Sequence, residues 1–226
     1  EYKGKIGIKN NSVVKYFKNL KTICNYAIKI ELIDKNPFNY FNGKIKVSEA
    51  IFLTENELEK IENKVFTVER LERVKDIFLF SCYTGYAPVD VMHLTKKNIV
   101  LDANKNLWIK TNRQKTGTRA NVPVLPSAMK IINKYQWIGD ELLPKISNQK
   151  MNGYLKEIAD VIGLNKNLTW YVARHTFATT VTLGNGIKIE NVSAMLGHTT
   201  IRQTQHYAKV LDQNVSVDMK KLMGKF

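Results

Sequence analysis

The chain has 226 residues, 44% of them hydrophobic, which is ample for a packed core. Its 35 Lys and Arg residues outnumber 20 Asp and Glu residues, giving a net charge of +15 and a pI near 9.7. A protein this basic typically binds a polyanion, usually nucleic acid, although a lysine-rich solvated surface has the same composition. No apolar run approaches the roughly twenty residues of a membrane span, and the first residues lack the apolar core of a signal peptide. The two cysteines, Cys24 and Cys82, indicate buried reduced thiols in a cytoplasmic protein.

The first predicted element is an amphipathic helix within residues 12–33. Its apolar residues recur at helical spacing, with lysines on the other face: Val13, Val14, Phe17, Leu20, Ile23, Ala27 and Ile30. The stretch "DKNPFNYFNGK" that follows contains Asn-Pro and Asn-Gly, which are turn dipeptides. Because one helix cannot bury its own apolar face, residues 1–46 are predicted to be the last part of a helical domain and a linker. Residues 47–226 are predicted to form a second domain with a C-terminal tail.

The second domain opens with a capping-box pattern, since Glu57 follows Thr54 by three positions. A longer helix is predicted to end at Gly85, and a short segment begins at Pro88, which suits a first helical turn. One hairpin follows, with the arms "LWIK" and "NVPVLP". Helices are then predicted over residues 127–136, 148–162, 172–185, 189–196 and 201–209. Glycines are predicted to cap three of them, at Gly163, Gly186 and Gly197. The fold class is therefore mostly α with a small antiparallel β-sheet.

Positive charge is concentrated in two places. Residues 1–50 contain ten lysines and four acidic residues, and residues 105–119 contain five basic residues and no acidic one. The second cluster covers the hairpin, so the hairpin is predicted to face a nucleic-acid backbone. Lys110, Arg119 and Arg202 are the predicted DNA contacts.

The final third of the chain contains the run "ARHTFATT" and then "LGHTTIRQTQHY", in which Tyr207 follows His198 by nine positions. With the Thr-Gly helix end at Gly85 and the basic loop containing Lys115, this pattern resembles the tyrosine recombinases of the phage-integrase family. The resemblance covers roughly residues 50–212, and residues 1–46 resemble the end of that family's core-binding domain. It is greatest to integrases of mobile elements in Bacteroides-type bacteria, where "CYTG", "DV", "RQKTG" and "ARHTFATT" recur together.

The resemblance implies that DNA is cut and rejoined through a 3′-phosphotyrosine bond, with no metal, cofactor or ATP. Such a reaction needs a nucleophile, a proton donor for the leaving 5′ oxygen and donors for charge on the non-bridging oxygens. By this resemblance Tyr207 is the nucleophile, Arg174 binds the scissile phosphate and His198 donates to a phosphate oxygen or to the phenolic oxygen. Lys115 would be the general acid, and Asp90 would orient a partner from behind the site.

One departure from the family pattern is Ala87, which stands where the family usually has a second phosphate-binding arginine after Thr-Gly. Alanine has no donor, so that role is lost or supplied from elsewhere. Arg113, two residues before Lys115, is the first candidate substitute, and Arg119 is the second. The alternative, that Arg113 contacts only backbone phosphates of the DNA, has equal weight.

A second departure is Tyr171, which replaces a histidine three residues before Arg174. A phenol donates one hydrogen bond to a phosphate oxygen but carries no imidazolium charge, and the indole N–H of Trp170 is a weaker alternative. Removing one transition-state donor typically costs on the order of 10²–10³ in rate. His175 and His206, which adjoin motif residues, are predicted to pack structurally.

The leading interpretation is a site-specific recombinase or integrase that integrates or excises a mobile element. It would bind double-stranded DNA as a tetramer, and the resemblance also allows accessory DNA-bending or excision proteins. The amphipathic tail after residue 214 would dock on a neighbouring protomer. Location in the bacterial cytoplasm, associated with the nucleoid and not with a membrane, is expected. The alternative interpretation, based on Ala87 and Tyr171, is a weakened or inactive DNA-binding protein of the same fold.

Overall fold

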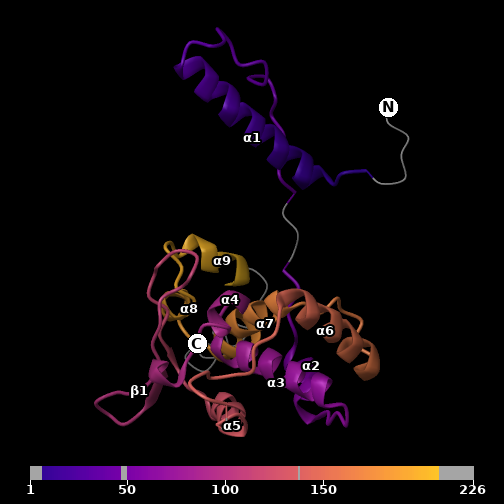
Figure 1. The fold of residues 1–226 in the computed structure, drawn as a ribbon, viewed down its shortest axis with the longest axis vertical. Helices are drawn as coiled ribbons and strands as arrows, with labels where there is room; N and C mark the ends of the chain where they lie inside the picture. Colours follow the sequence, from indigo (N-terminus) through magenta and orange to yellow (C-terminus); the bar gives the residue numbers. More distant parts are fainter. Residues whose placement is uncertain (1–6, 47–49, 137, 209–226) are drawn as a thin grey trace, which may run out of the picture. The chain divides into compact units, whose positions relative to one another are not determined.

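The computed structural model describes residues 7–46, 50–136 and 138–208 of the chain. They form two compact units that divide between Glu49 and Ala50, close to the boundary expected after residue 46 (Figure 1). The tail for which docking on a neighbour was predicted lies outside the described residues. Across the described ranges, every helix is too short or too polar to cross a lipid bilayer.

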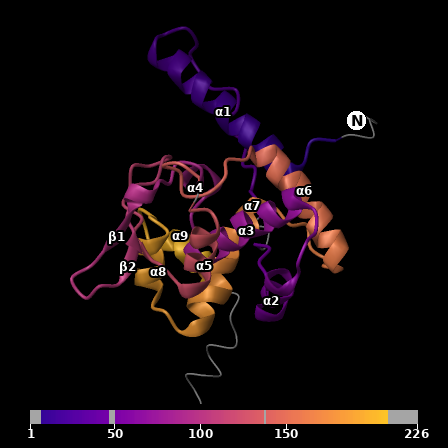
Figure 2. The ribbon, with the colours of Figure 1, turned by 60° about the horizontal axis from the view of Figure 1, so that its bottom comes forward.

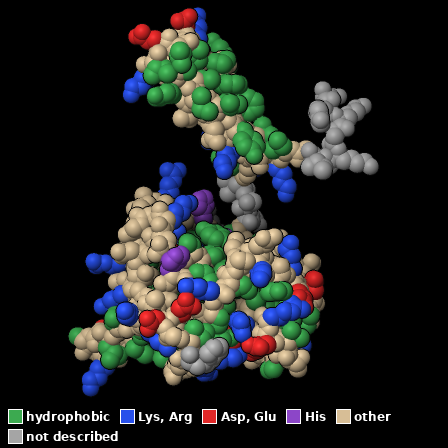
Figure 3. Space-filling model, in the orientation of Figure 1, with side chains coloured by type: hydrophobic (Ala, Val, Ile, Leu, Met, Phe, Trp, Pro, Cys, Tyr) green, Lys and Arg blue, Asp and Glu red, His purple; other side chains and the backbone are tan. Residues whose placement is uncertain are grey.

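The first unit is built on the helix α1 (Asn10–Lys29) and a segment that returns along it. Phe17 on the helix stacks on Phe41 at 4.1 Å between ring centroids and meets Phe38 edge-on at 5.6 Å. Val14 of the apolar stripe is also buried, but several other apolar side chains of the helix stay exposed, and Figure 3 shows apolar side chains along the visible face of this unit. The exposed members are Tyr16, Leu20, Ile23, Tyr26 and Ile30. As the sequence predicted, the helix does not bury its apolar face.

The second unit is mainly helical. Its α-helices are α2 (Glu55–Asn63), α3 (Glu69–Thr84), α4 (Pro88–Val91), α5 (Pro126–Lys134), α6 (Asn148–Ile162), α7 (Trp170–Thr176), α8 (Ile189–Met195) and α9 (Arg202–Ala208). The centre of the core is α3, in which every side chain from Val74 to Thr84 is buried. It packs against α5, α6 and α7 (Figures 1 and 2). Inside this contact the Trp170 indole donates to the Ser81 hydroxyl at 2.8 Å, so α7 is fixed to α3 by a buried polar bond as well as by packing.

The predicted helix ends are confirmed. The Thr54 hydroxyl accepts from the Glu57 backbone N–H, and the Glu57 carboxylate accepts from the Thr54 N–H, which completes the capping box. Gly85 ends α3 in the left-handed conformation, with φ of 71°. The other predicted caps also have positive φ: Gly163, Gly186 and Gly197.

The sheet is antiparallel, with the order β1 (Ile99–Leu101), β2 (Leu107–Ile109), β3 (Val122–Pro123). The β2–β3 pair is the predicted hairpin, but β1 was not predicted, because its three residues follow the segment from Pro88 without a turn signal. The Tyr86 hydroxyl lies within hydrogen-bond distance of the carbonyl oxygens of Ile109 (3.1 Å) and Ala120 (2.8 Å). Since Tyr86 directly follows the glycine that ends α3, the hairpin is fixed to the end of the central helix.

The single helix predicted over residues 172–185 is wrong in detail. After α7 the chain widens into a π-helix, η2 (Phe177–Thr182), and then tightens into a 3₁₀ turn, η3 (Leu183–Asn185). Threonine hydroxyls take part in the change: that of Thr182 donates to the carbonyls of Phe177 and Ala178, and that of Thr180 donates to Leu53. Such bonds compete with the regular helical ladder, which explains why apolar spacing did not show the break.

Gly85 offers a test of this packing, because a Cβ placed there would lie 2.3 Å from Cδ1 of Phe177. Gly163 has the same φ of 71° with open space around it. We expect Gly163→Ala to lower the free energy of unfolding by about 1–2 kcal/mol, the cost of left-handed backbone for alanine. Gly85→Ala should cost about 1–3 kcal/mol more through overpacking. Urea denaturation of both variants measures the difference, and equal losses would contradict the close approach of Phe177.

Candidate active site

A pocket of about 610 Å³ lies where the hairpin loop, the first turn of α7 and the α8–α9 region meet. It brings together side chains from segments far apart in the sequence. Six of the site residues predicted from the sequence line this pocket: Arg113, Lys115, Tyr171, His198, Arg202 and Tyr207. The described residues thus line the pocket with three Lys or Arg side chains, two histidines and two phenols, and with no carboxylate.

Arg174 lies beneath this pocket with only 1% of its surface exposed. Its Nη1 donates to the carbonyl of Gly85 at 2.7 Å, and its Nη2 donates to the carbonyl of Leu196 at 2.6 Å. These residues cap the C-terminal ends of α3 and α8, where the helix dipole is negative and stabilises a cation. Among the described residues, no carboxylate forms an ion pair with Arg174 and its Nε has no hydrogen-bond partner.

His198 is held between two side chains. Its Nε2 lies 3.2 Å from Nη2 of Arg174, and its Nδ1 lies 2.8 Å from the hydroxyl oxygen of Thr204. Burial, together with the charges of Arg174 and Arg113, lowers the pKa of His198 to about 4. The imidazole is therefore neutral at pH 7.

Tyr207 is one of the two buried side chains of α9 and is 6% exposed. Its ring lies 6.4 Å from that of His198 and nearly parallel to it, at 10°. Burial raises the pKa of the phenol and Tyr171 raises it further, whereas Arg174 and Arg113 oppose the rise. The phenol is thus protonated at neutral pH, and it needs a proton acceptor before it can act as a nucleophile.

Arg113 reaches the same place from the hairpin. Its Nη1 contacts the Gly197 carbonyl at 3.4 Å, and its Nε lies 3.9 Å from Oδ2 of Asp90. Asp90 is buried, and its Oδ1 accepts from the backbone N–H of Gln114 at 2.8 Å. The carboxylate therefore lies behind Arg113 and fixes the start of the loop. Gly197 is required here, because a Cβ at this position would lie 2.7 Å from Cδ of Arg113.

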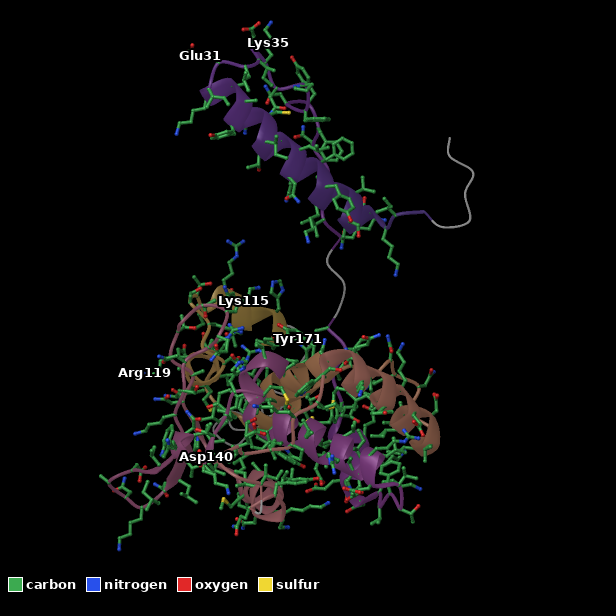
Figure 4. The ribbon with its side chains drawn as sticks, in the orientation of Figure 1. Glu31, Lys35, Lys115, Arg119, Asp140 and Tyr171 are labelled. Carbon is green, nitrogen blue, oxygen red and sulfur yellow. The ribbon has the colours of Figure 1, made fainter. Side chains whose placement is uncertain are left out.

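Ala87 lines a neighbouring pocket of about 490 Å³, to which Arg113, Lys115 and Tyr171 also contribute. Arg113 is thus adjacent both to the position of the missing arginine and to Tyr207. Arg119, the second candidate substitute, lines neither pocket but a separate groove beside Trp108. Figure 4 shows Lys115 at the loop near α9 and Arg119 farther along the same hairpin.

The hairpin loop is held in shape by its own backbone and by the turn before α9. The N–H of Arg113 donates to the Thr118 carbonyl and that of Gly117 donates back to Arg113, both at 2.8 Å. The Thr118 hydroxyl donates to the Gly197 carbonyl at 2.7 Å. These bonds leave Lys115 exposed at the pocket. Lys110 is also exposed on the hairpin, but it does not line the pocket.

The aromatic and histidine side chains near α7 and Tyr207 agree with the sequence predictions only in part. Tyr171 is 48% exposed and meets His175 edge-on at 4.8 Å, and His175 lies 5.4 Å from Tyr207. Trp170 is buried with its indole N–H bonded to Ser81, so the alternative that it donates to a phosphate is wrong. The packing predicted for His206 is also wrong, because His206 is exposed and lines the pocket.

Comparison with known proteins identifies the family. Residues 51–214 match the Phage integrase family, and residues 1–47 match the Phage integrase SAM-like domain. The chain belongs to the phage integrase family. It is an enzyme of the tyrosine-recombinase type. A curated relative is the tyrosine recombinase XerC of Pediococcus pentosaceus, which is 23% identical over 93% of this chain and 75% of its own length.

Solved structures of low sequence identity share the fold of this family member. The Tn1549 transposon integrase in complex with a circular intermediate DNA superposes with a TM-score of 0.74 at 17% identity, over 96% of this chain and 81% of that one. A lambda integrase dimer bound to a core site gives a TM-score of 0.69 at 16% identity, over 84% of this chain and 57% of that one.

The neutral state of His198 predicts a specific loss of stability in acid. Its pKa of about 4 in the fold lies below the ordinary 6.5, so the unfolded chain takes up the proton first as pH falls. The free energy of unfolding should therefore decline as pH drops from 6.5 towards 4. In His198→Gln this decline should be smaller. Urea denaturation across that range measures it, with exposed His93→Gln as the control. An unchanged decline in His198→Gln would show that His198 is not held neutral.

Proposed function

We propose that this recombinase breaks and rejoins double-stranded DNA at specific sites through a 3′-phosphotyrosine intermediate formed on Tyr207. The observation that carries the proposal is the convergence on one pocket of a buried tyrosine, a neutral histidine and two arginines. Neither arginine is hydrogen-bonded to a carboxylate within the described residues, although Asp90 lies 3.9 Å from Arg113. A site that holds cationic donors in this way is suited to an anionic group such as a phosphodiester.

The scissile phosphate would bind in the pocket, between Arg113 in its lining and the buried Arg174 beneath it. Each has an Nε without a hydrogen-bond partner among the described residues, and a buried unpaired donor of this kind is unfavourable until a ligand is bound. Arg113 would provide the donor that Ala87 lacks. The exposed Tyr171 hydroxyl would bond to a non-bridging oxygen, in place of the family's histidine.

In the cleavage step, the Tyr207 oxygen would attack phosphorus while the bond from phosphorus to the 5′ oxygen breaks. Nε2 of His198 would accept the phenolic proton once the phosphate has drawn the Arg174 N–H away from it. This differs from the donor role expected from the sequence, because in the free protein Nε2 faces an arginine donor. Lys115 would give a proton to the leaving 5′ oxygen. The reverse attack by another strand's 5′-hydroxyl would reseal DNA without ATP, because the phosphotyrosine bond conserves the phosphodiester energy.

The surrounding charge would bind the DNA backbone. Lys110, Arg119 and Arg202 are exposed cations of the second unit, and contacts of this kind make affinity fall with salt. We propose that residues 1–46 and 47–226 clasp the duplex as two domains and that the working form is a tetramer on two duplexes. The protein would integrate or excise a mobile element at the bacterial nucleoid, together with accessory DNA-bending proteins.

The first experiment is covalent trapping on a nicked suicide duplex that carries the junction sequence of the protein's own element. We expect a denaturant-resistant protein–DNA adduct with the unaltered chain and none with Tyr207→Phe, because phenylalanine removes only the attacking oxygen. Denaturing gels measure the adduct, and filter binding confirms that both proteins bind the duplex. Tight binding without any adduct would instead support the non-catalytic DNA-binding protein.

A second experiment asks whether Arg113 replaces the missing arginine. Arg113→Ala should slow adduct formation by about 10²–10³, the usual cost of one transition-state donor. Arg119→Ala removes the same charge from the same hairpin but outside the pocket, so it should weaken binding while leaving the single-turnover rate at saturating protein nearly unchanged. Equal rate losses in the two variants would mean that Arg113 acts only through the DNA backbone.

A further inference from the structure

Thr204 is a buried polar residue to which neither the sequence motifs nor the proposed chemistry assigns a role. It is 0% exposed, and its hydroxyl oxygen lies 2.8 Å from Nδ1 of His198. Burying a hydroxyl costs free energy unless the hydroxyl is hydrogen-bonded, so the bond to His198 is what stabilises this buried side chain. The question is which of the two atoms donates.

The contact of the other ring nitrogen, Nε2, identifies the donor. Nη2 of Arg174 lies 3.2 Å from Nε2 of His198, and a guanidinium nitrogen can only donate. Nε2 must therefore present its lone pair. A neutral imidazole carries one proton, so that proton is on Nδ1, and Nδ1 donates to the Thr204 oxygen. An imidazolium would place an N–H against the arginine N–H, which the geometry disfavours.

Thr204 also connects this proton to the nucleophile. The buried side chains of α9 are Thr204 and Tyr207, which are three residues apart and hence on one face of the helix. Docking of α9 through that face therefore brings the Thr204 oxygen to His198 at the same time as it buries the Tyr207 phenol.

We propose that Thr204 is a positioning residue that, when α9 is docked, stabilises His198 in the Nδ1–H tautomer, in which Nε2 is an acceptor. This inference rests on the proposed function for its catalytic meaning but not for the tautomer itself. Nε2 becomes the available base for the phenol as the arginine turns to the phosphate. An undocked α9 leaves both the nucleophile and its proton acceptor out of place.

The test replaces the hydroxyl and follows the two ring nitrogens. In the full chain labelled with ¹⁵N-histidine, long-range ¹H–¹⁵N correlation spectra distinguish protonated from unprotonated ring nitrogens. We expect the parent to show a protonated Nδ1 and an unprotonated Nε2 for His198. Thr204→Val, which keeps the branched shape but removes the oxygen, should lose this pattern, and Thr204→Ser should restore it. Thr200→Val, a change at an exposed threonine of the same turn, should leave the tautomer unchanged.

Adduct formation gives the second readout. Thr204→Val should slow it by about 10- to 100-fold, as for other residues that orient a functional histidine, with recovery in Thr204→Ser. An unchanged His198 tautomer in Thr204→Val, or a serine variant as impaired as the valine variant, would overturn the inference. A parent that forms no adduct would overturn the proposed function instead, and the spectra would still decide the role of Thr204.

Discussion

The packing of the second unit depends on one buried cation, the guanidinium of Arg174. Taking a guanidinium out of water costs several kcal/mol unless its donors are satisfied, and Arg174 meets that cost with carbonyl oxygens at the ends of α3 and α8. These two carbonyl oxygens are free to accept from Arg174 because the helices stop there: α3 ends at a left-handed glycine, and α8 ends just before another. Three helices that are distant in sequence are thereby held in one arrangement. The same guanidinium then contacts His198, so the charge that organises the core also sets the state of the site.

Electrostatics link the groups of the pocket to one another. Burial, and then the charges of Arg174 and Arg113, lower the pKa of His198, and the same two charges also work against the raised pKa of Tyr207. Under the proposed function, a neutral histidine next to a protonated phenol is a resting state in which Tyr207 does not attack. A phosphate that binds the arginines would weaken their hold on the histidine and supply the electrophile in the same event. The proposed function therefore implies a pocket that reacts only when a phosphate occupies it.

The sequence predicted which side chains gather at the candidate site, and it predicted few of the contacts that hold them there. Tyr207 and His198 were predicted from the family pattern, and Arg113 was predicted as one candidate substitute for the arginine missing at Ala87; the structure brings all three side chains to one pocket. Glycine caps were predictable because positive φ restricts the residue type. The π-helix after α7 was not, since it arises from threonine hydroxyl bonds that leave apolar spacing intact. Thr204 also carried no signal, because its role depends on a partner six residues away across a turn.

Arg113 lies on a different element from the residue that it is proposed to replace, and this affects how the site is assembled. An arginine at the position of Ala87 would be carried by the start of α4, next to the central helix. Arg113 is instead carried by a hairpin loop that reaches the pocket through the Gly197 carbonyl and through Asp90. Local opening of such a loop requires much less free energy than unfolding the helices around it. Under the proposed function, the full set of phosphate donors therefore exists only while the hairpin is docked, and the fraction of molecules ready to react would change while the core stays folded.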